Sequence, residues 1–179
     1  MAIPSHDEAT CEAGGSEALR AFLARHGVPG ELVRPGAEMP TVARAAAALG
    51  VAPAQIVKSV VFQHKKDARR VCVAIVAGDA RVHPGKVARA LDLSQLKLAS
   101  AGAALEATGY AVGGIPPLGY PLALPVVVDQ RVLAHAVVFG GGGDEHHMLR
   151  IAPADIVRAT SAVAADVVVD AVEADEVPA

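Results

Sequence analysis

The stretch IVKSVVFQHKKDARRVCVAIVA, residues 56–77, holds two apolar runs on either side of a charged segment. Both runs, 56–62 and 71–77, are rich in β-branched residues, which favour strands. The charged segment HKKDARR, residues 64–70, reads as the turn that joins them. We therefore predict a β-hairpin, whose strands pair in antiparallel fashion.

Helices are predicted on both sides of this hairpin from capping residues and hydrophobic periodicity. The first runs from its expected cap Ser16 to its stop at Gly27, and the second from Thr41 to Gly50. Further helices are expected at about 84–91, 100–108 and 153–159, and further strands at 125–129, 134–139 and 147–151. Helices and strands are interspersed without a regular βαβ rhythm, which predicts a mixed α+β domain.

The ends of the chain are set apart by their composition. Residues 1–15 are rich in small and acidic residues and are predicted to be a disordered leader. The domain itself is expected to span residues 16–160, a length that suits one core. Residues 161–179 end acidic, and the sequence leaves open whether they add a strand or form a tail.

The composition of the chain excludes several classes of protein. The net charge is −3, with no Trp, two Tyr and three Phe, so a long basic or aromatic nucleic-acid surface is not expected. No apolar run approaches the ~20 residues of a membrane span, and no signal peptide is indicated, which favours a cytoplasmic protein. The two cysteines, Cys11 and Cys72, form neither a disulfide framework nor a metal-binding pair.

Lys58 is the unusual residue of the first hairpin strand. Because alternate residues of a strand share a face, Lys58 lies on the same face as Ile56, Val60 and Phe62, and Ser59 on the other. Lysine is almost never buried without a partner. One reading is a strand end whose ammonium reaches water. The other is a cation at the mouth of a pocket, placed to meet a phosphate, a carbonyl or an ester oxygen.

The segment GGIPPLG, residues 113–119, is a second candidate. Its two glycines permit unusual backbone geometry and its two prolines stiffen the following turn. Such a loop can present the amides of Gly113, Gly114 and Ile115 to a developing oxyanion. The alternative is a tight connection between a helix and a strand.

Other polar or glycine-rich features carry weaker signals. The run at 140–143 lacks the residues of a phosphate-binding loop and reads as a flexible hairpin turn. His146 and His147 are expected on opposite faces of a strand, so no metal site is predicted, although one of them could reach a pocket. Asp129 reads as a turn residue that caps backbone amides, with a role in a pocket as the alternative. The charges at 64–70 suit a solvated turn or contact with a few phosphates.

Taken in order, several motifs resemble one known family. They are AAAALGV, QIVKSVVF, VAGD, GKVARAL, TGYAVGGIPPLG and PVVVDQ, followed by the glycine turn. Together they are similar to the YbaK/ProX family, which is related to the editing domain inserted in some bacterial prolyl-tRNA synthetases. The resemblance covers about residues 16–160. It implies an α+β fold with a single, largely antiparallel, barrel-like sheet flanked by helices.

The resemblance implies an enzyme that hydrolyses the ester between a wrong amino acid and the 3′ end of tRNA. A synthetase pocket discriminates poorly between amino acids that differ by one methylene, worth only ~1–3 kcal/mol, so a second site removes the errors. The resemblance implies that no conventional nucleophile takes part, and we expect no metal and no cofactor. The expected catalytic groups are Lys58 and the backbone of Gly113, Gly114 and Ile115. The expected substrate contacts are Thr41, Ser59, Pro117, Asp129 and His146.

The expected partner is mischarged tRNA, with alanine, cysteine or a similar small amino acid on tRNA-Pro, and prolyl-tRNA synthetase is a further expected partner. The alternative function is a non-catalytic module that binds tRNA ends or a protein. A metal hydrolase that uses His146 and Asp144 is a weaker alternative. The sequence leaves the amino acid and the oligomeric state open.

Overall fold

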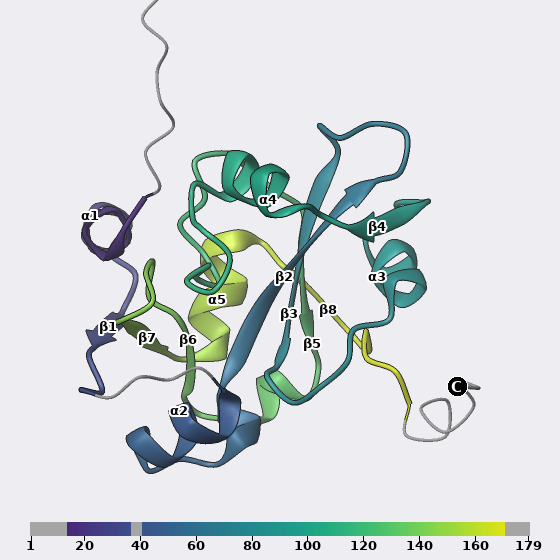
Figure 1. The fold of residues 1–179 in the computed structure, drawn as a ribbon. Helices are drawn as coiled ribbons and strands as arrows, with labels where there is room; N and C mark the ends of the chain where they lie inside the picture. Colours follow the sequence, from purple (N-terminus) through teal and green to yellow (C-terminus); the bar gives the residue numbers. More distant parts are fainter. Residues whose placement is uncertain (1–13, 37–40, 171–179) are drawn as a thin grey trace, which may run out of the picture.

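The computed structural model describes residues 14–36 and 41–170 of the chain (Figure 1). Residues 1–13, which make up most of the predicted leader, lie outside the described residues, as do 37–40 and 171–179. The described part contains two sheets with helices packed around them, which confirms the predicted mixed α+β class.

The larger sheet is built around the predicted hairpin. Its strand order is β4-β2-β3-β5-β8, formed by Leu96–Leu98, Val57–His64, Val71–Ala77, Val126–Asp129 and Val163–Ala165. β2 and β3 pair in antiparallel register, with Val57 opposite Ala77 and Gln63 opposite Val71, so the hairpin prediction is confirmed. β5 and β8 add on in parallel, and β8 shows that the segment after residue 160 contributes an edge strand.

The smaller sheet has the order β1-β7-β6 and is antiparallel, with strands at Gly30–Val33, Met148–Ile151 and Val138–Gly141. An isolated parallel bridge between Ile56 and Phe139 links it to the start of β2. The described strands therefore form two sheets that meet at one corner. The expected description of a single barrel-like sheet is loose, because the strands do not close on themselves.

Helices cover the larger sheet on both faces (Figure 1). The helices are α1 Ser16–His26, α2 Val42–Leu49, α3 Pro84–Ala90, α4 Ala101–Thr108 and α5 Pro153–Thr160, with 3₁₀ turns η1 Pro53–Gln55 and η2 Val132–Ala134. Apolar residues of α1, α4 and α5 join the inward residues of β2, β3 and β5 in the main core. α3 covers the opposite face. α2 lies over the corner where the two sheets meet, above a small core that contains Ile56, Phe139 and Met148.

The predicted helix caps are only partly those of the structure. Thr41 caps α2 by accepting the backbone N–H of Arg44 at 3.2 Å, and Ser100 caps α4 in the same way through Ala103. Ser16 does not cap α1, because it is the first helical residue and its side chain is buried. Among the described helices, none combines the length and the apolar character that crossing a membrane requires.

Candidate active site

A pocket of about 270 Å³ lies at the corner where the two sheets meet. Four parts of the chain form its wall: the first turns of α2, the start of β2, the loop after α4, and the turn between β6 and β7. The side chains that line it range from apolar to charged: Thr41, Val42, Ala45, Ile56, Val57, Lys58, Ser59, Val112, Gly113, Ile115, Gly141, Asp144, Glu145, His147 and Met148. It therefore joins an apolar wall to a set of groups that can bind or transfer protons.

Lys58 stands in this pocket as a partly buried cation. Its Nζ donates a hydrogen bond to the carbonyl oxygen of Gly78, 3.0 Å away. Burial lowers the pKa of Lys58 from its ordinary value, and the nearby charge of Asp79 opposes part of that effect. Lys58 therefore lines a pocket, as the second of the two readings of this residue expected.

Gly78 brings a backbone carbonyl within reach of that ammonium. Its N–H donates to the carbonyl oxygen of Ile56 at 2.7 Å, which fixes the strand ends against each other. A Cβ at this position would lie 2.5 Å from Cγ2 of Val42, so only glycine lets α2 pack so closely here. The motif VAGD thus has a structural reason, which is to seat α2 and hold Lys58.

The loop at 113–117 contributes Gly113 and Ile115 to the same pocket as Lys58, but not all of its amides are free. Gly113 has φ of +101°, a conformation that favours glycine, and both Gly113 and Ile115 line the pocket. The N–H of Gly114 donates to the carbonyl oxygen of Ala111 at 3.1 Å. The prediction that Gly114 offers its amide to an oxyanion is therefore corrected. No hydrogen bond within the described residues occupies the N–H of Gly113 or Ile115.

Ser59 and a tyrosine hold this loop in place. The hydroxyl groups of Ser59 and Tyr120 both donate to the carbonyl oxygen of Pro116, at 3.0 and 2.8 Å. Burial raises the pKa of Tyr120, which keeps it a hydrogen-bond donor. Ser59 lines the pocket as expected, but its hydroxyl proton is given to the loop. Pro117, an expected substrate contact, is buried and does not line the pocket.

The glycine run at 140–143 is a packing surface rather than a flexible turn. A Cβ on Gly140 would press on the ring of Pro117, and one on Gly141 would collide with the carbonyl group of Ile115. Gly143 donates its N–H to the carbonyl oxygen of Gly114 at 2.9 Å. The absence of side chains thus lets the 113–117 loop lie directly on β6.

The turn after the glycines places His147, not His146, in the pocket. Asp144 accepts the backbone N–H groups of both histidines at 2.8 and 2.9 Å, and its carboxylate also contacts Nδ1 of His147 at 2.8 Å. The side chain of His147 is 23% exposed, whereas that of His146 is 60% exposed beside Glu145. β7 begins only at Met148, so the strand alternation assumed for these residues does not apply. The place in the pocket that was expected of His146 is therefore held by His147.

Asp129 lies outside this pocket. Its side chain is 2% exposed, and the carboxylate accepts backbone N–H groups from Arg131 and Val167, each at 3.0 Å. The side chain of Arg131 pairs with it and with Asp166. Asp129 is therefore a turn residue that caps backbone amides, which is the first of the two readings of its sequence position. Thr41, by contrast, lies at the exposed rim of the pocket, as expected.

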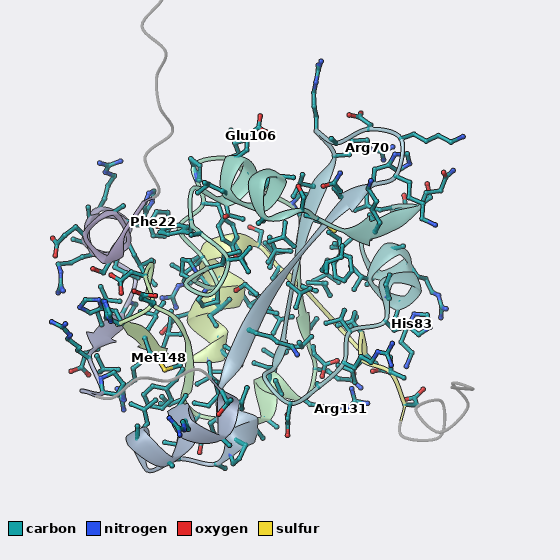
Figure 2. The ribbon with its side chains drawn as sticks, in the orientation of Figure 1. Phe22, Arg70, His83, Glu106, Arg131 and Met148 are labelled. Carbon is teal, nitrogen blue, oxygen red and sulfur yellow. The ribbon has the colours of Figure 1, made fainter. Side chains whose placement is uncertain are left out.

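The charged turn at 64–70 is far from the pocket. β2 runs from Val57 to His64, so at roughly 3.3 Å per residue the turn begins about 20 Å from Lys58. Figure 2 shows Arg70 at one end of the molecule and Met148, which lines the pocket, toward the other. These charges are therefore not part of the site.

Sequence reasoning missed several residues of the pocket. Val42 and Ala45 were expected only as helix residues, and Met148 only as a strand residue. Asp144 entered only as a metal ligand in a weaker alternative. No group of three or more metal-binding side chains occurs in the part of the chain that the structure describes. The pairing of Asp144 with a histidine three residues later was the one local signal available.

Comparison with known proteins gives a consistent result. The family described as the aminoacyl-tRNA editing domain matches residues 37–159. A proline–tRNA ligase of Lysinibacillus sphaericus is 30% identical over 114 residues, which are 63% of this chain and 20% of the ligase. The uncharacterized protein YwhH of Bacillus subtilis is 28% identical over 116 residues, 65% of this chain and 72% of that protein. This chain therefore corresponds to about a fifth of the ligase.

A solved structure described as that of a proposed trans-editing enzyme for prolyl tRNA synthetase superposes with a TM-score of 0.78. Its sequence is 30% identical, and the match covers 87% of this chain and 97% of the other. The likeness thus extends over nearly the whole of that protein.

Proposed function

Because this chain belongs to the family of aminoacyl-tRNA editing domains, also known as YbaK/ProX, we propose that it is a deacylase that hydrolyses the ester of mischarged aminoacyl-tRNA. The observation that carries the proposal is that Lys58 and the loop residues Gly113 and Ile115 line one and the same pocket. Lys58 supplies a positive charge, and Gly113 and Ile115 supply backbone N–H groups. These are the two kinds of group that stabilise an ester oxygen as it becomes negative.

Lys58 acts in this proposal as an anchor and not as a nucleophile. The ammonium already donates to the Gly78 carbonyl, which fixes its direction and leaves its other protons for a substrate oxygen. A partly buried cation interacts more strongly with an anion than one in open water. Lys58 therefore holds the terminal phosphate or the ester carbonyl, while the N–H groups of Gly113 and Ile115 meet the developing oxyanion.

The apolar residues that line the pocket favour a small apolar aminoacyl side chain. Val42, Ala45, Ile56 and Met148 are among them. The volume of about 270 Å³ is below the ~300–1,000 Å³ of sites for drug-sized ligands, so it suits an aminoacyl group with part of its ribose. Alanine or cysteine on tRNA-Pro is the substrate we propose, since the ligase relative and the solved structure both concern proline.

We further propose that the domain acts on tRNA released from prolyl-tRNA synthetase. The structure described as a proposed trans-editing enzyme for prolyl tRNA synthetase matches 87% of this chain, which supports action in trans. The net charge of −3 favours recognition confined to the single-stranded end of the tRNA.

The test is a deacylation panel. Purified protein is mixed with tRNA-Pro charged with alanine, cysteine or serine, and with correctly charged Pro-tRNA-Pro as the control. The proposal expects at least one small amino acid to be released well above the uncatalysed rate while proline is retained. Binding of every tRNA with no release of any amino acid would favour the non-catalytic module instead.

A further inference from the structure

The pocket contains a carboxylate–imidazole pair, Asp144 and His147. This pair has no part in the proposed anchoring of the substrate by Lys58 and the loop amides. Both Oδ1 and Oδ2 of Asp144 lie close to Nδ1 of His147, at 2.8 and 2.9 Å, and both residues line the pocket. Their side chains are 31% and 23% exposed, so the contact is partly shielded from water. Such shielding strengthens a contact between a carboxylate and an imidazole.

The carboxylate determines which ring nitrogen of His147 is free. A carboxylate that is ionised can only accept, so Nδ1 of His147 must carry the proton that it shares with Asp144. In the neutral ring this leaves a lone pair on Nε2. Partial burial by itself raises the pKa of Asp144. Hydrogen bonds from the His147 ring, the His146 amide and the Ser16 hydroxyl outweigh this effect, so the pKa of the carboxyl lies below its ordinary value. Asp144 is therefore an anion at neutral pH.

The pair is more than a cap for the turn. Asp144 already stabilises the turn through the backbone N–H groups of His146 and His147. The bond to the ring adds nothing to that cap, but it fixes the orientation of the imidazole within the pocket. A carboxylate that orients a histidine and stabilises its protonated form is the arrangement that general-base catalysis uses on many folds.

We propose that His147 accepts the proton of the attacking water, and that Asp144 is the positioning residue that orients it; this inference rests on the proposed deacylase function. As the water oxygen bonds to the ester carbon, Nε2 of His147 takes one water proton and becomes an imidazolium. The bond from the ester carbon to the ribose oxygen then breaks, and the imidazolium returns the proton to that oxygen. The products are the free amino acid and the ribose hydroxyl, with His147 restored.

The experiment measures kcat and KM for single amino acids on tRNA-Pro, with and without added imidazole. His147→Ala should lower kcat by about 10²- to 10⁴-fold with little change in KM, as loss of a general base does. Free imidazole should restore part of the rate, because it can occupy the space of the missing ring. The matched control is His146→Ala, which removes a neighbouring ring outside the pocket and should keep wild-type kinetics.

Two further variants separate a catalytic role from a structural one. Asp144→Asn keeps an oxygen for the turn amides but loses the charge, so it should lower kcat and leave KM nearly unchanged. His147→Gln fills most of the space of the ring, and it should be as slow as His147→Ala while melting like the wild type.

The outcomes are distinct from those that test the function itself. A wild-type protein that releases no amino acid would refute the deacylase proposal. An active wild type with an equally active His147→Ala variant would refute the proton-transfer role alone. A His147→Ala variant that is slow, melts normally and gains nothing from imidazole would also overturn it.

Discussion

Replacement of Lys58 by methionine separates the function of this residue from its contribution to folding. Methionine matches the length of the lysine stem and removes only the charge and the donor. The lost hydrogen bond to Gly78 costs about 1.5–3 kcal/mol, as is usual for a charged donor. That loss is offset because the variant no longer carries the free-energy cost of partly burying an ammonium group. Desolvation of that group is also what lowers its pKa. The net change in unfolding free energy should be within about 1 kcal/mol, or about 2–4 °C in Tm.

The catalytic effect of the same change should be much larger. Removal of one preorganised group that stabilises an oxyanion costs about 2.7–4 kcal/mol, or about 10²- to 10³-fold in kcat. Lys58→Met should therefore lose nearly all deacylation while it remains folded. Lys97→Met is the matched control, since Lys97 is exposed on β4 and does not line the pocket.

The assay is release of a labelled amino acid from mischarged tRNA-Pro, with thermal unfolding measured on the same preparations. Lys97→Met should keep both wild-type activity and wild-type Tm. A Lys58→Met variant that retains activity within twofold of the wild type would refute the anchoring role. A Tm loss well above 4 °C would show that the stability argument is wrong, and that the residue is structural.

Three further predictions follow from the structure. Because the pKa of Lys58 is lowered, the alkaline fall in the enzyme's kcat/KM should occur at a lower pH than the pKa of a free lysine would give. The negative charge of Asp79 opposes this lowering, so Asp79→Asn should move the fall to a still lower pH. Gly141→Ala should destabilise the fold by about 1–3 kcal/mol in urea unfolding, since its Cβ meets the loop backbone, whereas Gly102→Ala, with open space on a helix, should be neutral or stabilising. The lowered pKa of Asp144 contributes stability above about pH 4 that is lost as the pH falls, so the stability difference between wild type and Asp144→Asn should shrink below that pH in unfolding curves.

The elements that the sequence predicts well are those with strong local signals. The β2–β3 hairpin follows from two β-branched runs with a charged turn between them, and it forms with the expected antiparallel pairing. Thr41 and Ser100 cap their helices because the required side-chain oxygen is placed before an apolar run. Lys58 was identified because a charge on an otherwise apolar strand face is unusual, and alternation then assigned its face.

The elements that were missed depend on partners far along the chain. β1 and β4 are short and lack an apolar alternation of their own, and they exist because β7 and β2 offer them an edge. The parallel addition of β5 and β8 cannot be inferred from the hairpin. The division into two sheets likewise depends on where Phe139 meets Ile56, a tertiary contact.

The pocket was harder to predict than the strands. The glycine run at 140–143 looked flexible, because sequence alone cannot show that the 113–117 loop lies on it. His146 and His147 were assigned by strand alternation, but they lie in a turn held by Asp144, so the wrong histidine was selected. A role for Asp129 in the site was a second reading of its place at a strand end, whereas it caps the nearby Arg131 amide and that of Val167, which only folding brings close.

The most direct test of the account is single-turnover release of alanine from Ala-tRNA-Pro by an excess of the purified protein. The account predicts release well above the uncatalysed rate, no release of proline from Pro-tRNA-Pro, and near-complete loss of release in Lys58→Met. Release that does not depend on Lys58, or none from any small aminoacyl-tRNA-Pro, would contradict it.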